Sequence, residues 1–321
     1  MIKKIKSPIL LIFYNRPKKT KKLLKIIEKI NFSKVYIKVD GYKNIIDKKK
    51  VNLVLKEVIN FKKKFKSKVM IKKEKRNQGL QINIFTAINW LFKKENRFIF
   101  LEDDHKPSIS FFYFCDKLLS IYEKNEKIMQ IKGSCFLNEK SDDYYFSKYS
   151  DVIGWATWKN SWKKMVQNFN YNKLIKKKVI DKFFEDKEKS EWFKQYLYRE
   201  TITPASKGLW STWFQLSVAK NDGLCISPLK NLVVHEGIKK NSNPTHYDKS
   251  YEILDEYQLD EIDIAKITKK KSRWDDDLDS KNFLVVKYTD PIFKIINRIK
   301  WYFKYHIQIK NDKKLSASIK I

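Results

Sequence analysis

Three consecutive acidic residues, Glu102, Asp103 and Asp104, follow the apolar run of residues 98–101. Three carboxylates at the end of a buried strand repel one another, so they need a cation or hydrogen-bond donors nearby. A divalent ion that prefers oxygen ligands, Mg²⁺ or Mn²⁺, meets this need and also binds phosphate oxygens. A bare run of three acids is more often a solvated turn. The buried strand before it and the aromatic segment 111–114 after it favour a metal site.

Other polar residues have the types and spacing that suit a nucleotide. Arg76 and Asn77 precede a predicted helix that begins near Gly79, and a helix N-terminus beside an arginine binds phosphate. Asp40 follows a predicted strand and can accept a hydrogen bond from a ribose hydroxyl or a base N–H. A role as a turn residue before Gly41 suits Asp40 equally well.

Short apolar runs alternate with helical patterns through the first 135 residues. This alternation predicts an α/β fold with a mainly parallel central sheet flanked by helices. Ligands of such sheets bind outside the carboxyl ends of the strands, where the polar residues above are expected. We expect strands at 9–13, 35–39, 69–71, 98–101 and 128–131, and helices from Pro17 and over 51–65, 79–92, 108–122, 177–200 and 209–220.

The chain divides by composition into a catalytic unit and a basic tail. Residues 1–270 contain no flexible linker and are expected to form one domain, with a nucleotide-binding half (1–135) and an acceptor half (136–270). Residues 271–321 are predicted to be an appended helical tail. Apolar residues recur at helical spacing between Ile292 and Phe303, with basic residues between them. Such a helix suits an anionic membrane surface, and packing on the catalytic domain suits it equally.

The balance of 69 basic and 37 acidic residues gives a formal net charge of +32. Lysine is spread over every segment and no nucleic-acid motif is present, so a generic solvated surface is favoured over a functional basic face. The three cysteines form no CxxC pair or zinc spacing, which predicts reduced thiols in a cytoplasmic protein. The apolar run after Lys6 is too short for a signal peptide, and no stretch reaches the ~20 apolar residues of a membrane span.

An ordered set of motifs gives the chain a family resemblance over about residues 7–250. It resembles bacterial nucleotide-diphospho-sugar transferases of surface-polysaccharide gene sets and, more distantly, the eukaryotic N-acetylglucosaminyltransferases that begin complex N-glycans. The resemblance implies a GT-A fold, a nucleotide-sugar donor, a glycan or lipid-linked acceptor and a divalent metal, usually Mn²⁺. The motifs are residues 8–17, Val39–Gly41, Asn77–Gly79, Leu101–Asp104 with Pro107, Ser110–Phe112, and Gly154–Trp158 with Trp162.

The resemblance also assigns roles. Asp104 would hold the metal, while Glu102 and Asp103 would contact the ribose and nucleotide. The end of the first strand and Asp40 would frame the base, and the segment from Asn231 to His246 would close over the diphosphate. The donor site is therefore expected to include Phe13, Asn15, Arg16, Asp40, Gly41, Arg76, Asn77, Gly79, Glu102 and Asp103.

One departure from the family concerns the general base. Relatives have an aspartate in a Trp-flanked helix start, whereas Trp210–Trp213 contains serine and threonine, which cannot deprotonate an acceptor hydroxyl unaided. Glu236 is the leading replacement, with Glu200 and His235 as alternatives. On the acceptor side we expect Trp155, as a ring that stacks on a sugar, and Trp210. The spacing of Trp155, Trp158 and Trp162 is typical of a packed helix face and favours the core for the last two.

The two late histidines are possible metal ligands, because enzymes of this type often add a histidine to the metal shell. His246 is the stronger expectation and His235 the weaker, and for either one a surface or packing role remains the alternative. A sugar-nucleotide pyrophosphorylase is argued against, because no glycine follows the first strand between Tyr14 and Lys19. The remaining alternative is a catalytically degenerate nucleotide-sugar-binding or basic binding protein.

Overall fold

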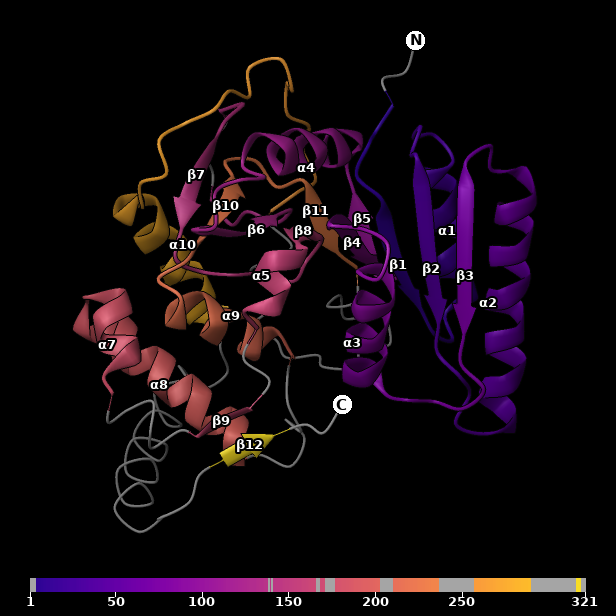
Figure 1. Ribbon diagram of the computed structural model, residues 1–321, viewed down its shortest axis with the longest axis horizontal. Coiled ribbons are helices and arrows are strands. Elements are labelled where there is room, and N and C mark those ends of the chain that lie inside the picture. The colour runs from indigo at the N-terminus through magenta and orange to yellow at the C-terminus, as the bar shows by residue number, and fades with distance from the viewer. Residues whose placement is uncertain are drawn as a thin grey trace.

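The computed structural model describes residues 4–137, 139, 141–165, 168–170, 177–202, 210–236, 257–289 and 316–318. An eight-stranded sheet with the order β3-β2-β1-β4-β8-β6-β10-β7 forms its centre (Figure 1). Only β8 and β7 run antiparallel to the other strands of this sheet. The strands are β1 (Ile9–Phe13), β2 (Lys34–Val39), β3 (Lys68–Lys73), β4 (Arg97–Glu102), β6 (Ile128–Lys132), β7 (Tyr144–Ser147), β8 (Trp155–Trp158) and β10 (Leu224–Pro228).

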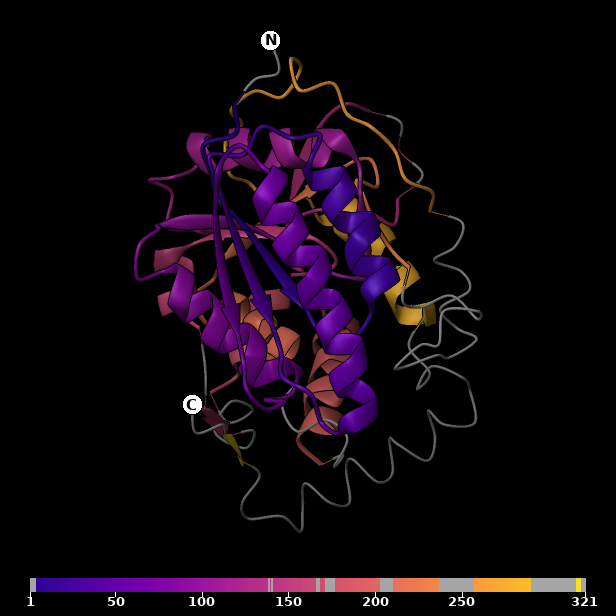
Figure 2. The same ribbon diagram turned by 90° about the vertical axis from the view of Figure 1, so that its right-hand side faces the viewer.

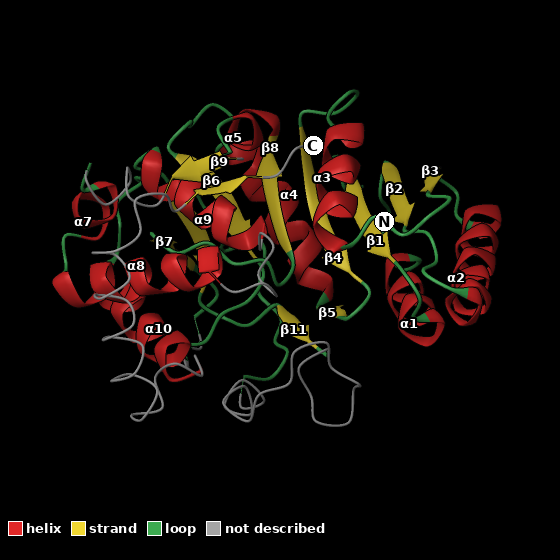
Figure 3. Cartoon of the chain, turned by 90° about the horizontal axis from the view of Figure 1, so that it is seen from below, coloured by secondary structure: helices red, strands yellow, loops and turns green. Residues whose placement is uncertain are grey.

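Helices cover both faces of this sheet (Figure 3), so the predicted α/β fold with a mainly parallel sheet is confirmed. On one face pack α1 (Pro17–Ile27), α2 (Ile45–Lys64) and α4 (Ile109–Ile121). On the other pack α3 (Leu80–Leu91), α5 (Lys159–Lys163), α7 (Val179–Phe184), α8 (Lys187–Ile202) and α9 (Trp210–Lys220). The two small sheets pair β5 (His105–Pro107) with β11 (Val233–His235) and β9 (Asn168–Asn170) with β12 (Ser316–Ser318).

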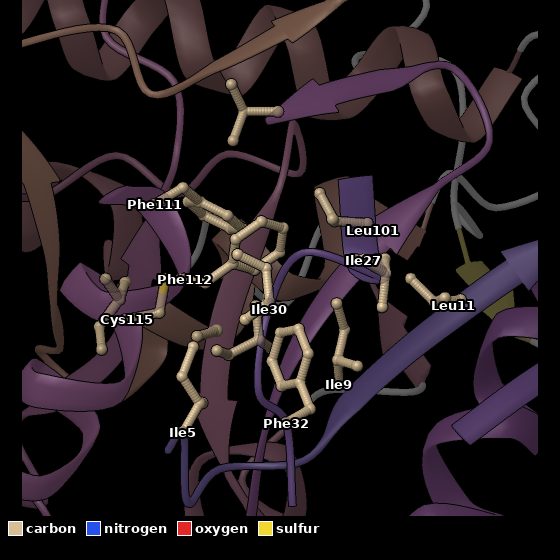
Figure 4. Close-up of a cluster of buried hydrophobic side chains, with 14 of the residues drawn as sticks. Ile5, Ile9, Leu11, Ile27, Ile30, Phe32, Leu101, Phe111, Phe112 and Cys115 are labelled. Atoms are coloured by element: carbon tan, nitrogen blue, oxygen red, sulfur yellow. The ribbon is translucent and has the colours of Figure 1, made fainter. Parts of the chain in front are cut away.

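Strand β1 shows why the sheet needs helices on both sides. Ile9, Leu11 and Phe13 belong to the first core cluster, whereas Leu10 and Ile12 belong to the second. Successive side chains of a strand point to opposite faces, so an unbroken apolar run is what a strand buried on both faces requires. Figure 4 shows the first cluster, in which residues of α1 and α4 close over those of β1 and β4.

Several element predictions differ from the structure, and strands β7, β9, β10, β11 and β12 were not predicted at all. Helix α2 begins at Ile45 and not at 51, because the Asn44 side chain caps it by accepting from the Asp47 N–H at 2.9 Å. The short strand β5 was not predicted. The helical reading of residues 155–158 is wrong, because this segment is strand β8 and pairs with both β4 and β6. Trp158 and Trp162 are nevertheless buried, as expected.

The first part of the predicted tail packs on the domain. Asp279, in α10 (Asp276–Thr289), accepts from the Lys148 N–H and the Trp274 indole N–H, each at 2.7 Å, and is fully buried. Trp274 and Asp279 therefore lie beside β7, where Trp274 bridges to Phe146. The predicted amphipathic helix of residues 292–303 lies outside the described residues.

The three cysteines, Cys115, Cys135 and Cys225, are buried free thiols, as the sequence predicted. Burial raises the pKa of all three thiols, which keeps them protonated and poorly reactive. Within the described part of the chain, no helix combines the length and apolar character that a membrane crossing requires.

Candidate metal and nucleotide site

The acidic triplet lies at the carboxyl edge of the sheet, next to the end of β1. Strands β1 and β4 are paired in parallel with Ile12 opposite Glu102, so the residues that follow the two strands meet. One guanidinium nitrogen of Arg16, Nη1, donates to Asp103 Oδ1 at 2.9 Å and to Asp104 Oδ2 at 2.8 Å. Arg16 is thus the cationic partner of two of the three acids. The parallel pairing of β1 with β4 brings these residues together.

A second pairing brings two histidines to the same place. Strand β5 follows the acidic triplet directly, and it pairs with β11 so that His105 lies opposite His235. The ring centroids are 5.5 Å apart, and the Nε2 atoms of His105 and His235 lie 3.9 Å and 3.8 Å from Asp104 Oδ1. Among the described residues, the ligand atoms of Asp104, His105 and His235 lie within 4.8 Å of one another. The cluster therefore combines one carboxylate with two imidazoles.

The protonation states suit a cation. Burial lowers the pKa of His105 to about 3 and also lowers that of His235, so both rings are neutral near pH 7. Burial acts to raise the pKa of Asp104, but the two imidazoles and Arg16 lower it to about 2. A neutral imidazole has no charge with which to lower the pKa of Asp104. Arg16 is therefore the partner that keeps Asp104 ionised at neutral pH.

The other two acids of the triplet respond differently. Burial, reinforced by the charges of Asp104 and Asp103, raises the pKa of Glu102 to about 8. Burial also raises the pKa of Asp103 to about 6, although Arg16 opposes the rise. Carboxyl groups with such different proton affinities on three consecutive residues are typical of a functional site. At neutral pH the triplet therefore has an ionised Asp104 and a protonated Glu102.

The two histidines are not equivalent as ligands. His105 Nδ1 accepts from the backbone N–H of Glu102 at 3.1 Å, so the proton of its neutral ring is on Nε2. The Nε2 atom of His105, which faces Asp104, therefore has no lone pair to offer a metal ion. The Nε2 atom of His235 lies 3.8 Å from Asp104 Oδ1. A carboxylate and a neutral imidazole suit Mn²⁺ better than Mg²⁺, which prefers oxygen ligands alone. Asp104 and His235 fit the predicted metal.

Asp40 organises the nucleotide side of the edge. Its Oδ1 accepts from the N–H groups of Gly41 and Gln78 at 2.8 and 2.9 Å, and its Oδ2 accepts from the Asn77 amide at 2.8 Å. Burial raises the pKa of Asp40, and backbone hydrogen bonds from Gln78, Gly41 and Gly79 oppose that rise. A Cβ at residue 41 would overlap the Arg76 backbone, so only glycine allows the two loops to approach this closely.

The remaining donor-site residues are placed along the same edge. Tyr14 and Asn15 both donate to the carboxylate of Asp47 in α2, Asn15 at 2.7 Å. The side chain of Phe13 is buried in the first core cluster, and its carbonyl accepts from the Asp40 N–H at 2.9 Å. Figure 1 places these segments where β1 and β2 lead toward α1 and α2.

The segment before α3 is the outermost part of the expected site. The Arg76 side chain is exposed. Gly79 precedes α3 with a positive φ of 79°, and no atom lies within 4 Å of where its Cβ would be. The space in front of this helix N-terminus is therefore open to a ligand.

The expected acceptor tryptophans lie in the core. Trp155 is 0% exposed and Trp210 is 4% exposed. The two rings pack against each other at 5.4 Å between centroids, and Trp155 also packs on Phe100 and Phe214. Neither ring offers a face on which a sugar can stack, so the stacking prediction for Trp155 does not fit this structure. The spacing could not reveal this, because β8 is an interior strand.

The structure describes the surroundings of Glu236 but not the side chain of Glu200. The backbone N–H of Glu236 donates to the Asp104 carbonyl at 2.7 Å, and its own carbonyl accepts from Lys19. Glu236 therefore lies beside the metal cluster. Glu200 is in α8, where the side chains at the end of the helix are outside the described residues, and His246 is outside them altogether.

Asp151 is a site residue that sequence reasoning missed. Its Oδ1 accepts from the Ile153 N–H at 3.0 Å, and its Oδ2 accepts from the Ser134 hydroxyl. Ser134 follows Gly133, whose carbonyl accepts from the Leu232 N–H at 2.9 Å just before β11. Asp151 and Asp104 are the carboxylates whose charges act on His235. The available signal was its place three residues before the Gly154–Trp158 motif.

Comparison with known proteins adds little. No family model and no curated protein matches the chain. Among solved structures, it is similar to a UDP-glucose pyrophosphorylase in complex with UDP-glucose, with 10% sequence identity and a TM-score of 0.24. The match covers 50% of this chain and 66% of that one, just under two thirds of its length. At this level the similarity carries no argument about function.

Proposed function

We propose that the protein is a metal-dependent glycosyltransferase of the GT-A type. It transfers a sugar, of the hexosyl or N-acetylhexosaminyl class, from a nucleotide-diphosphate sugar to a glycan or lipid-linked acceptor in surface-polysaccharide synthesis. The observation that carries the proposal is the cluster of Asp104 and His235 beside Arg16, at the carboxyl edge of a mainly parallel sheet. The order of motifs in the sequence supports the same assignment.

The chemistry of the cluster suits a diphosphate leaving group. Asp104 and His235 would hold a divalent cation, which neutralises negative charge on the departing diphosphate. Arg16 is oriented by Asp103 and Asp104 and supplies a second positive charge at the same edge. Asp40, which Gly41, Asn77 and Gln78 hold in place, would accept from a base N–H or a ribose hydroxyl. The donor would thus extend from Asp40 across Arg16 to Asp104.

The acceptor hydroxyl needs a base, and two described carboxylates lie near His235. Glu236 follows His235 directly and is tied to Asp104 through the backbone. Asp151 is held by the Ser134 hydroxyl and by the backbone N–H groups of Val152 and Ile153. A base near this cluster would take the proton as the hydroxyl attacks the sugar. We keep Glu236 as the first assignment and add Asp151 as the second.

A thermal-shift panel of nucleotide sugars, with and without Mn²⁺, tests the donor assignment. A true donor stabilises the folded state by mass action, by about 2.7 kcal/mol at a hundred times its Kd. We expect one donor to raise the melting temperature only when Mn²⁺ is present. A panel in which no nucleotide sugar shifts the melting temperature contradicts the proposal.

A degenerate nucleotide-sugar-binding protein is the second candidate. One observation favours it: the Trp210–Trp213 stretch, where relatives have a base, contains no carboxylate and is largely buried. Metal-dependent hydrolysis of the bound donor distinguishes the two candidates. The transferase releases nucleoside diphosphate slowly even without an acceptor, whereas the binding protein shows the thermal shift and no hydrolysis.

A further inference from the structure

Lysines are concentrated on one layer of the fold, which the sequence did not reveal. Helix α1 contains five lysines and no acidic residue, and α2 contains seven lysines and two acidic residues. The two helices pack side by side across one face of the sheet, as Figure 2 shows. Helix α3, on the opposite face of the same strands, has no charged residue at all. The net positive charge is therefore asymmetric about the sheet.

The same layer also exposes apolar side chains. Ile45 and Ile46 are 68% and 67% exposed, and Leu53 and Ile59 are 52% and 48% exposed. All four are on α2, and at about 100° per residue Ile45, Leu53 and Ile59 fall within about 120° of arc. This arc lies opposite the buried stripe of Val51, Val54, Val58 and Phe61. Exposed lysines at 49, 56 and 63 share the outward side.

We propose that the outer surface of α1 and α2 docks on an anionic lipid bilayer. A bilayer interface accepts aliphatic side chains among lysines, with the apolar groups in the acyl boundary and the ammonium groups at the headgroups. The negative surface potential of such a bilayer attracts nearby lysines. A nucleic acid would also attract the lysines, but it offers no partner for four exposed aliphatic side chains. The combination favours lipid.

The geometry gives this surface a consequence for the site. Helices α1 and α2 begin directly after the carboxyl ends of β1 and β2, where Arg16 and Asp40 lie. The backbone N–H of Asn77 donates to the carbonyl of Tyr42, three residues before Ile45. The exposed isoleucines are thus joined to the rim of the candidate site. Docking would hold that rim at the membrane, although the docking itself does not depend on the proposed transfer reaction.

Co-sedimentation of the full chain with vesicles tests the proposal. We expect the chain to bind vesicles of phosphatidylcholine that contain about 30–40% phosphatidylglycerol, because this fraction gives a strong negative surface potential. Binding should be lost with pure phosphatidylcholine and should weaken as the salt concentration rises. Replacing both Ile45 and Ile46 by Ser should weaken binding at least about 10-fold, as should a triple change to Gln at Lys49, Lys56 and Lys63.

Matched variants elsewhere serve as controls. Leu80 and Ile82 are exposed apolar residues on the uncharged helix α3, and Lys93, Lys94 and Lys124 are exposed lysines away from α1 and α2. The same changes to Ser and Gln at these positions should leave vesicle binding unchanged. Equal binding by the α2 variants and the wild type overturns the proposal. So does a wild-type protein that ignores anionic vesicles, whether or not it binds duplex DNA in the same buffer.

Discussion

The backbone N–H of Glu236 donates to the carbonyl oxygen of Asp104 at 2.7 Å. This bond joins the acidic turn after β4 to a segment from the other half of the chain. With the β5–β11 ladder beside it, the bond fixes His235 against the Asp104 carboxylate. The candidate metal site is therefore one rigid unit formed by two distant segments, and each segment can be tested separately.

The first prediction concerns Asp104. Asp104→Asn should abolish Mn²⁺-dependent transfer, because it removes the ionised oxygen ligand with little change in volume. The fold should stay intact because the amide occupies the same space, although the lost ion pair with Arg16 should lower the melting temperature. Activity is measured as release of nucleoside diphosphate from the donor. Asp222→Asn, which alters an exposed pair with Lys127, is the control and should be fully active. Full activity of Asp104→Asn, or of the wild type in excess chelator, contradicts a metal site.

The second prediction separates the two histidines. His235→Ala should weaken Mn²⁺ binding by at least about 10-fold, because the Nε2 atom of His235 lies 3.8 Å from Asp104 Oδ1, within the candidate metal cluster. His105→Ala should have a smaller effect on affinity, because His105 Nδ1 is occupied by the Glu102 N–H. Titration calorimetry or the electron paramagnetic resonance signal of free Mn²⁺ gives both affinities. An equal loss in the two variants would show that His105 is also a direct ligand.

The third prediction concerns the base. One of Glu236→Gln, Asp151→Asn, Glu200→Gln and His235→Asn should lower turnover by at least about 100-fold, the lower end of what general-base catalysis supplies. The KM for the donor should stay within a few-fold for Glu236→Gln and Asp151→Asn, whereas His235→Asn should also lose metal affinity. Steady-state kinetics with saturating Mn²⁺ separates the two effects. If no variant reaches that loss, none of these residues is the base.

The fourth prediction concerns pH and Glu102. The pKa of Glu102 is raised from 4.5 to about 8, so the folded protein binds this proton more tightly than the unfolded chain. Its contribution to stability is complete below pH 4.5 and is lost as the pH rises to about 8. Glutamine cannot ionise, so the Glu102→Gln variant does not lose this stability as the pH rises. In chelator, its melting temperature should therefore rise relative to the wild type between pH 5 and pH 8, by at least about 2 °C.

The control for this pH dependence is Glu123→Gln, whose side chain is 59% exposed beside Arg97. It should track the wild type at every pH. A constant difference between Glu102→Gln and the wild type from pH 5 to pH 8 would mean that Glu102 has an ordinary pKa. The measurement is made by differential scanning calorimetry in a series of buffers of equal ionic strength.

The fifth prediction concerns Gly41. Gly41→Ala should lower the melting temperature and weaken donor binding, because its Cβ would overlap the Arg76 backbone and push apart the two loops that surround Asp40. In Gly79→Ala the new Cβ would meet no atom, but the backbone at φ 79° and ψ 156° lies in a region almost confined to glycine, which costs an alanine about 1–3 kcal/mol. Donor binding that is unchanged in Gly41→Ala would show that the 76–79 loop takes no part in the site.

Much of the first half follows from sequence alone, because its signals are local. The unbroken apolar run of β1 indicated a strand buried on both faces, and Pro17 marked the start of α1. The acidic triplet at the end of a buried strand indicated a charged site at the sheet edge. Arg16 and Asp104 were both expected at strand ends on the carboxyl edge, and the parallel pairing of β1 with β4 in the structure brings them into contact.

Only the tertiary structure decided the rest, because it depends on contacts between distant segments. Nothing local places His235 beside Asp104, since β5 and β11 are three residues each and form only against one another. A tryptophan at position 155 could line a site or fill the core, and the local sequence is the same in both cases. In the structure β8 lies between β4 and β6, so Trp155 is buried in the core. Likewise, the lysines of α1 and those of α2 form a single basic surface only because the two helices pack side by side. The sequence determined which residues can do chemistry, and the packing determined which of them meet.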